Sequence, residues 1–183
     1  MDRPAEGQMS RALTPWKALL YGAVAVGGID FTYATVFVVL KGRPWYRAWQ
    51  GVASAVLGEG SFTGGYPTAL LGILLHFTVA ACIVSVYLIA SRWIPFLRRR
   101  TLLWGFVFGV TAFFVMNLVV VPLTRIGPQP LVWTPFAIGG LLVHAFLLGP
   151  AAAHFAGRAA WRAASSNSCP PPLVPRESDP GVR

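Results

Sequence analysis

The chain has 183 residues, of which 55% are apolar and only 11% are charged, and its formal net charge is +9. Soluble domains carry about a quarter charged residues, so this composition excludes an ordinary soluble globular domain. The net charge does not indicate nucleic-acid binding, because the basic residues flank long apolar runs and do not form one patch.

Four apolar stretches are long enough to cross the hydrocarbon core of a bilayer, which takes about 20 residues in a helix. Backbone amides in lipid must be bonded within their own segment, so we expect each stretch to be helical. The spans cover about residues 17–40, 67–90, 102–123 and 135–156. The sequence therefore predicts an all-α, polytopic membrane protein with a bundle of four transmembrane helices.

The ends of the chain differ from the spans in composition. Residues 1–15 form a polar tail and residues 163–183 a proline-rich tail, and we expect both to be disordered because neither can bury an apolar face. Residues 16–162 then form one transmembrane domain. We expect the first span to be retained, because its apolar run is too long for a signal peptide, carries Asp30 and lacks a small-residue cleavage site.

The segment between the first two spans predicts an amphipathic helix over residues 44–58. Its apolar residues recur at helical spacing from Trp45 and Trp49 onward, while Arg47 lies elsewhere around the helix. A tryptophan-bearing helix of this kind is expected at the membrane surface. Two interpretations stay open: an interfacial anchor of the aromatic-belt type, or a lid of Trp45, Arg47 and Trp49 over a polar site.

The third span carries a GxxxG motif at Gly105 and Gly109, a spacing that lets helices approach closely. We expect the motif to serve packing inside the bundle, with homodimerisation as the alternative. Pro122 is expected to end or bend the same span.

The distribution of basic residues predicts the orientation of the spans. Basic residues precede the first span, occur in the loop between the second and third, and follow the fourth. The loop between the third and fourth holds only Arg125, and the loop between the first and second holds Lys41, Arg43 and Arg47. By the positive-inside rule, we expect both termini and the middle loop in the cytoplasm. Arg98, Arg99 and Arg100 of the middle loop are expected to contact acidic lipid headgroups.

The second and fourth spans begin with one shared pattern, PTALLGILLH at residues 67–76 and PFAIGGLLVH at residues 135–144. Proline suits a helix start, because the amide proton that it lacks would be unpaired there. Each half of the chain thus has a polar span followed by a histidine span, and two spans per half preserve the orientation. The pattern fits either a parallel internal duplication or a chance similarity of apolar helices.

Four polar residues inside the spans share a similar expected depth: Asp30, His76, Asn117 and His144. Counted at about 1.5 Å per residue from the outer ends of their spans, they fall about 9–15 Å below the outer surface. Ionisable residues inside spans are costly, and they are usually functional or paired. We therefore identify these four residues as a candidate intramembrane binding or proton site, with Asp30 as its charged centre.

The chemistry of this polar cluster admits three interpretations. The side chains act as interhelical hydrogen-bond partners, or as proton-titrating groups, since imidazole changes charge near neutral pH. In the third and least favoured interpretation, His76 and His144 are axial ligands of a haem. We otherwise expect no cofactor and no metal, because no carboxylate–histidine spacing supports a metal site. We identify no catalytic residue, because Walker, GxSxG, HExxH and dinucleotide motifs are absent from the sequence.

These features leave three classes of function open. The first is a small inner-membrane protein that handles a solute, a lipid or a proton at the polar cluster, in transport or in sensing. The second is a non-catalytic scaffold or assembly subunit, whose polar residues lock the helices and whose partner is a second copy or another membrane protein. The third is a haem-binding electron carrier or an intramembrane enzyme.

Several segments resemble a family of small bacterial four-span membrane proteins. They lie within residues 18–158 and read GGIDFTYATVF, RPWYRAWQGVASAVLG, GILLHF, MNLVVVPL and GGLLVHAFLLGP. The chain is more distantly similar to YagU-like inner-membrane proteins, which also pair a histidine-bearing span with a proline-ended one. The resemblance implies a four-helix bundle in a bacterial inner membrane and carries over no catalytic residue.

Overall fold

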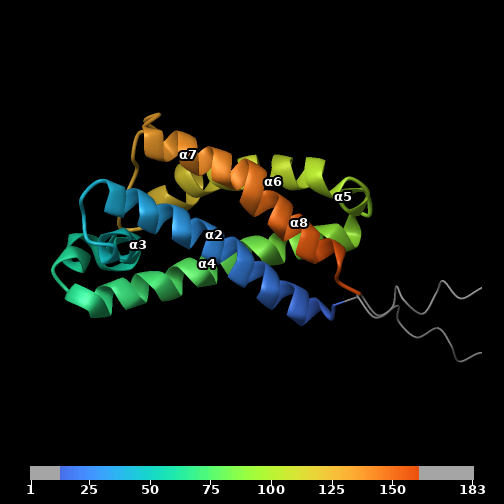
Figure 1. Ribbon diagram of the computed structural model, residues 1–183, viewed down its shortest axis with the longest axis horizontal. Coiled ribbons are helices and arrows are strands. Elements are labelled where there is room, and N and C mark those ends of the chain that lie inside the picture. The colour runs from blue at the N-terminus through green and yellow to red at the C-terminus, as the bar shows by residue number, and fades with distance from the viewer. Residues whose placement is uncertain (1–12, 161–183) are drawn as a thin grey trace, which may run out of the picture.

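The computed structural model describes residues 13–160, and in this range four long helices form a bundle in which each helix runs antiparallel to the one before it (Figure 1). The helices are α2 (Pro15–Leu40), α4 (Gly65–Trp93), and two composite spans, Thr101–Leu123 and Pro135–Gly157. Each is long and apolar enough to cross a membrane. The predicted all-α bundle is confirmed, and its helices begin and end within three residues of the expected spans.

The short described helices lie at the two ends of the bundle. Helix α3 (Tyr46–Leu57) and the 3-10 turn η1 (Gly58–Phe62) connect α2 to α4, and α3 folds back against the end of the bundle (Figure 1). Helix α5 (Phe96–Arg99) lies at the opposite end, in the loop between α4 and the third span. Helix α3 therefore lies at the opposite end of the bundle from α5.

Both ends of the described chain meet beside the middle loop. The amide of Leu13 donates to the carbonyl oxygen of Arg158 over 2.9 Å, and the amide of Ala160 donates back to Leu13 over 2.8 Å. Arg98 of the middle loop donates from Nη2 to the carbonyl oxygen of Ala159 over 2.7 Å. Residues 1–12 and 161–183, which hold most of the expected N-terminal tail and all of the C-terminal tail, lie outside the described range.

The third and fourth spans approach each other closely at glycines. The third begins with α6 (Thr101–Val115), whose Gly105 and Gly109 face the fourth span. A Cβ atom on Gly109 would lie 1.9 Å from the carbonyl oxygen of His144, and one on Gly149 would lie 2.0 Å from that of Gly105. The GxxxG motif thus packs inside the bundle, as expected.

Each of these two spans contains a π-helical turn that ends two residues before a proline. The turns are η2 (Met116–Val120), followed by Pro122, and η4 (His144–Leu148), followed by Pro150. A proline inside a helix lacks an amide hydrogen and crowds the carbonyl group four residues earlier. A π turn before the proline widens the helix there. We expected Pro122 to end or bend the third span, and that span ends at Leu123, directly after Pro122.

The remaining parts of the two spans are regular or 3-10 helix. After η2, the third span ends in the 3-10 turn η3 (Val121–Leu123). The fourth span consists of α7 (Pro135–Val143), η4 and α8 (Gly149–Gly157). Its start is capped by Thr134, whose hydroxyl accepts a hydrogen bond from the amide of Ala137.

Candidate functional site

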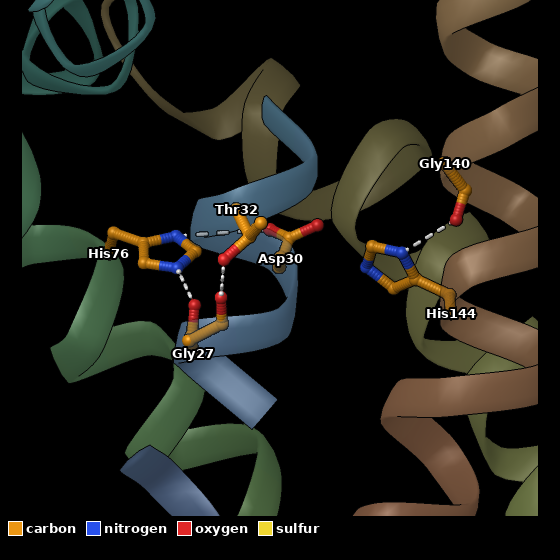
Figure 2. A network of polar contacts seen from close by, with 7 residues as sticks. Gly27, Asp30, Thr32, His76, Gly140 and His144 are labelled. Carbon is orange, nitrogen blue, oxygen red and sulfur yellow. Dashed lines mark hydrogen bonds and ion pairs between the residues drawn. The ribbon is translucent and has the colours of Figure 1, made fainter. Parts of the chain in front are cut away.

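Asp30 of α2 and His76 of α4 face each other between their helices (Figure 2). The Nδ1 atom of His76 lies 3.9 Å from Oδ2 of Asp30, which is within ion-pair range and beyond hydrogen-bond range. The Nε2 atom of His76 lies 2.9 Å from the carbonyl oxygen of Gly27. The side chain of His76 is 12% exposed and that of Asp30 27%. Two of the four predicted site residues therefore meet.

Trp49 of α3 covers the His76 side of this pair. Its indole ring is fully buried and meets the His76 ring edge-to-face, with 5.0 Å between centroids. The same indole stacks on Phe31 of α2, with 4.1 Å between centroids. Helix α3 comes this close because the facing position on α4 is Gly72, where a Cβ atom would lie 1.8 Å from the carbonyl oxygen of Trp49.

Trp45 and Arg47, the other two residues of the expected lid, face the loop that follows α3. Arg47 donates from Nη1 to the carbonyl oxygen of Phe62 over 2.9 Å and to Oε1 of Gln50 over 3.2 Å. Gln50 in turn donates from Nε2 to the carbonyl oxygen of Gly65 over 2.9 Å. Trp45 is 43% exposed and contacts neighbouring tyrosine rings. These side chains fix α3 to the start of α4, and Trp49 alone of the three contacts the pair.

His144 and Asn117 each bond to their own helix. His144 donates from Nδ1 to the carbonyl oxygen of Gly140 over 2.8 Å, and Asn117 donates from Nδ2 to that of Phe113 over 2.8 Å. The ring of His144 contacts the Phe113 ring edge-on. Figure 2 draws His144 on the other side of Asp30 from His76. Among residues 13–160, no hydrogen bond or ion pair joins His144 or Asn117 to the Asp30–His76 pair.

Tyr33 joins α2 to the fourth span, a role that the sequence analysis did not assign. Its hydroxyl donates to the carbonyl oxygen of Phe136 over 2.7 Å, and its ring stacks on the Phe136 ring. Gly139 makes room for the phenol, since a Cβ atom there would lie 2.5 Å from Tyr33 Oη. No pattern in the sequence pairs Tyr33 with Phe136 or with the glycine that admits its ring.

The described residues contain no group of three or more His, Cys, Asp or Glu side chains arranged to hold a metal ion. His76 has both ring nitrogens directed at protein oxygens, whereas His144 has only Nδ1 so directed. The chemistry that the site offers is therefore that of one carboxylate and one imidazole beneath an aromatic cover.

No family model matches the chain, and no curated protein and no solved structure gives a significant match. The class of the protein follows from its fold: four helices, each able to cross a bilayer, make it a multi-pass integral membrane protein. The resemblance to small bacterial four-span proteins stays a prediction.

Proposed function

We propose that this membrane protein binds and releases a proton at the Asp30–His76 pair, in a transport or sensing role in a bacterial inner membrane. The observation that carries the proposal is the direction of the two ring nitrogens of His76. A carbonyl oxygen only accepts hydrogen bonds, so the Nε2 atom beside Gly27 carries a hydrogen. The other nitrogen, Nδ1, is the one that faces the Asp30 carboxyl group.

An additional proton would change the electrostatics of this pair. With His76 neutral and Asp30 ionised, the lone pair of Nδ1 would face a carboxylate oxygen 3.9 Å away. A proton on Nδ1 converts this contact into an attractive ion pair, and a proton on the carboxyl group removes its negative charge. Since the pair lies between two apolar spans, where unpaired charge is costly, its proton state bears on the contact between α2 and α4.

The surroundings of the pair support the same role. Trp49 from α3 and Phe77 from α4 contact the His76 ring, and neither carries a titratable group. The titratable neighbour on α2 is Tyr33, whose hydroxyl is already bonded to Phe136. The Asp30 side chain stays 27% exposed, so protein atoms cover it only in part.

The orientation with both termini in the cytoplasm is part of the proposal. The described chain ends and the middle loop lie at the same end of the bundle (Figure 1). Arg99 and Arg100 are exposed at this end, which suits contact with acidic headgroups. Arg98 donates to Ala159, and this hydrogen bond gives it a structural role besides any lipid contact.

The proposal is tested by the melting temperature of the detergent-purified protein between about pH 5 and 8, the range in which histidine ordinarily changes charge. Binding of a proton to the folded state alone makes stability pH-dependent. We expect a pH-dependent melting temperature whose variation is largely lost in both Asp30→Asn and His76→Gln. The matched control is His154→Gln, because His154 is exposed on α8. A pH-independent melt, or an unchanged variation in Asp30→Asn, would contradict the proposal.

A non-catalytic scaffold is the second candidate, because the side chains of His144 and Asn117 form hydrogen bonds within their own helices. Their side chains bond the carbonyl groups of Gly140 and Phe113, next to the two π turns, and so stabilise distorted helix. If the whole polar cluster had this function, Asp30→Asn and His76→Gln would lower the melting temperature equally at every pH. The experiment above therefore separates the two candidates.

A further inference from the structure

An apolar groove of about 720 Å³ runs along α2 beside the fourth span. One face of α2 lines it from Val24 to Leu40, and Val143 and Leu147 close it from the fourth span. The sixteen helical steps from Val24 to Leu40 correspond to about 24 Å. This length exceeds the half of the hydrocarbon core, about 15 Å, that one leaflet occupies. The groove is therefore long enough for an acyl chain.

The polar atoms of the groove are already used within the protein. Thr32 donates its hydroxyl hydrogen to the carbonyl oxygen of Gly28 over 2.8 Å, and Tyr33 donates its own to Phe136 over 2.7 Å. No other residue that lines the groove has a polar side chain. A polar solute would find no free donor here, whereas a hydrocarbon chain needs none.

The ammonium group of Lys41 lies near one end of the groove. Lys41 follows directly after Leu40, is exposed, and holds its Nζ atom 5.6 Å from the centre of the Phe37 ring, which lines the groove. Within residues 13–160, no carboxylate pairs with this ammonium group. An apolar groove with a cation at its end matches a molecule with an apolar chain and an anionic head.

We propose that the groove binds one acyl chain of an anionic phospholipid, with the phosphate group of that lipid on Lys41. This site is separate from the Asp30–His76 pair and does not depend on the proposed proton function. A lipid bound in this way would contact α2 and the fourth span together and would stabilise their contact.

Gly28 offers a direct way to fill the groove. A Cβ atom on Gly28 would meet no heavy atom within 4 Å, and the residue lines the groove. Gly28→Leu is therefore expected to occupy the groove without disturbing the helices. Gly51 on α3 is the matched control, because a Cβ atom there also meets no heavy atom within 4 Å and the residue is not part of the groove.

The experiment is native mass spectrometry of the full chain after incubation with phosphatidylglycerol or phosphatidylethanolamine. We expect one retained phosphatidylglycerol, favoured about fivefold, the ratio that corresponds to about 1 kcal/mol for a basic residue at a membrane surface. Gly28→Leu should lose the lipid and Gly51→Leu should retain it. Lys41→Gln should bind both lipids equally. If Gly28→Leu melts far below the wild type, Leu147→Trp fills the groove from the exposed face of the fourth span.

Two results would overturn the proposal. One is equal retention of phosphatidylglycerol by the wild type and by both groove-filling variants. The other is a dimer of the wild type that Gly28→Leu dissociates, because the groove would then hold a helix of a second copy.

Discussion

The indole ring of Trp49 meets the imidazole ring of His76 edge-to-face, with 5.0 Å between the ring centroids, and this contact joins α3 to the candidate proton site. Aromatic pairs in this geometry contribute about 0.5–1.5 kcal/mol beyond the burial of their area. Through this contact a short helix outside the four spans touches a residue inside them. Helix α3 is thus part of the site as well as a connection between spans.

Replacing Trp49 should destabilise the protein according to the volume that is lost. Trp49→Ala removes a fully buried ring and is expected to cost about 3–5 kcal/mol. Trp49→Phe should cost much less, because the buried Nε1 group has no hydrogen-bond partner to lose in the described residues. Thermal unfolding of both variants, with the half-exposed Trp45→Ala as control, measures the difference. Equal losses for Trp49→Ala and Trp45→Ala would show that α3 does not pack as described.

Gly72→Ala should separate α3 from α4. The added Cβ atom would lie 1.8 Å from the carbonyl oxygen of Trp49, a backbone atom that cannot turn aside. Overpacking of this kind typically costs about 1–3 kcal/mol, and we expect a lower melting temperature together with a loss of the pH dependence. Gly60→Ala is the control, because a Cβ atom there meets no heavy atom within 4 Å. A melting temperature for Gly72→Ala equal to that of the control would rule out this close contact.

Gly109→Ala should destabilise the protein without changing its oligomeric state. The new methyl group would lie 1.9 Å from the carbonyl oxygen of His144 within the same chain. The melting temperature reports the loss of stability, and light scattering in detergent reports the oligomeric state. Gly157→Ala is the control for both measurements. A variant that melts normally but loses a dimer would instead assign the GxxxG motif to homodimerisation.

The purified protein should show no Soret band when it is produced in haem-replete cells. Both ring nitrogens of His76 are directed at protein oxygens, so axial ligation would require the loss of the Gly27 contact or the Asp30 contact. An absorbance spectrum decides the point. A Soret band that disappears in both His76→Gln and His144→Gln would replace the proton proposal with a haem site.

Hydropathy was enough to predict the four spans, because lipid forces each segment to satisfy its own backbone hydrogen bonds. The expected depth of the polar side chains below the outer membrane surface was enough to suggest that Asp30 and His76 meet. Depth does not determine the direction in which a side chain points, since one residue along a helix turns the direction by about 100°. For this reason His144 and Asn117 share the expected depth, yet they bond to their own helices.

Two further features depend on packing or on local geometry. A proline follows two residues after each π turn, at Pro122 and Pro150, and the sequence analysis considered only the first of these prolines. The groove along α2 depends on how far the fourth span stands from Gly28 and Thr32. Tyr33 and Phe136 join the same two helices, and no single segment of the sequence reveals that contact.

The most direct test of the proton site is nitrogen-15 NMR of the histidine side chains in the detergent-solubilised protein. The sequence contains three histidines, and His→Gln variants assign their signals. We predict that neutral His76 carries its hydrogen on Nε2, and that acidification adds a second proton on Nδ1, the atom facing Asp30. Two results would contradict the account. One is a neutral His76 with its hydrogen on Nδ1, and the other is a His76 nitrogen-15 signal that changes neither on acidification nor in Asp30→Asn.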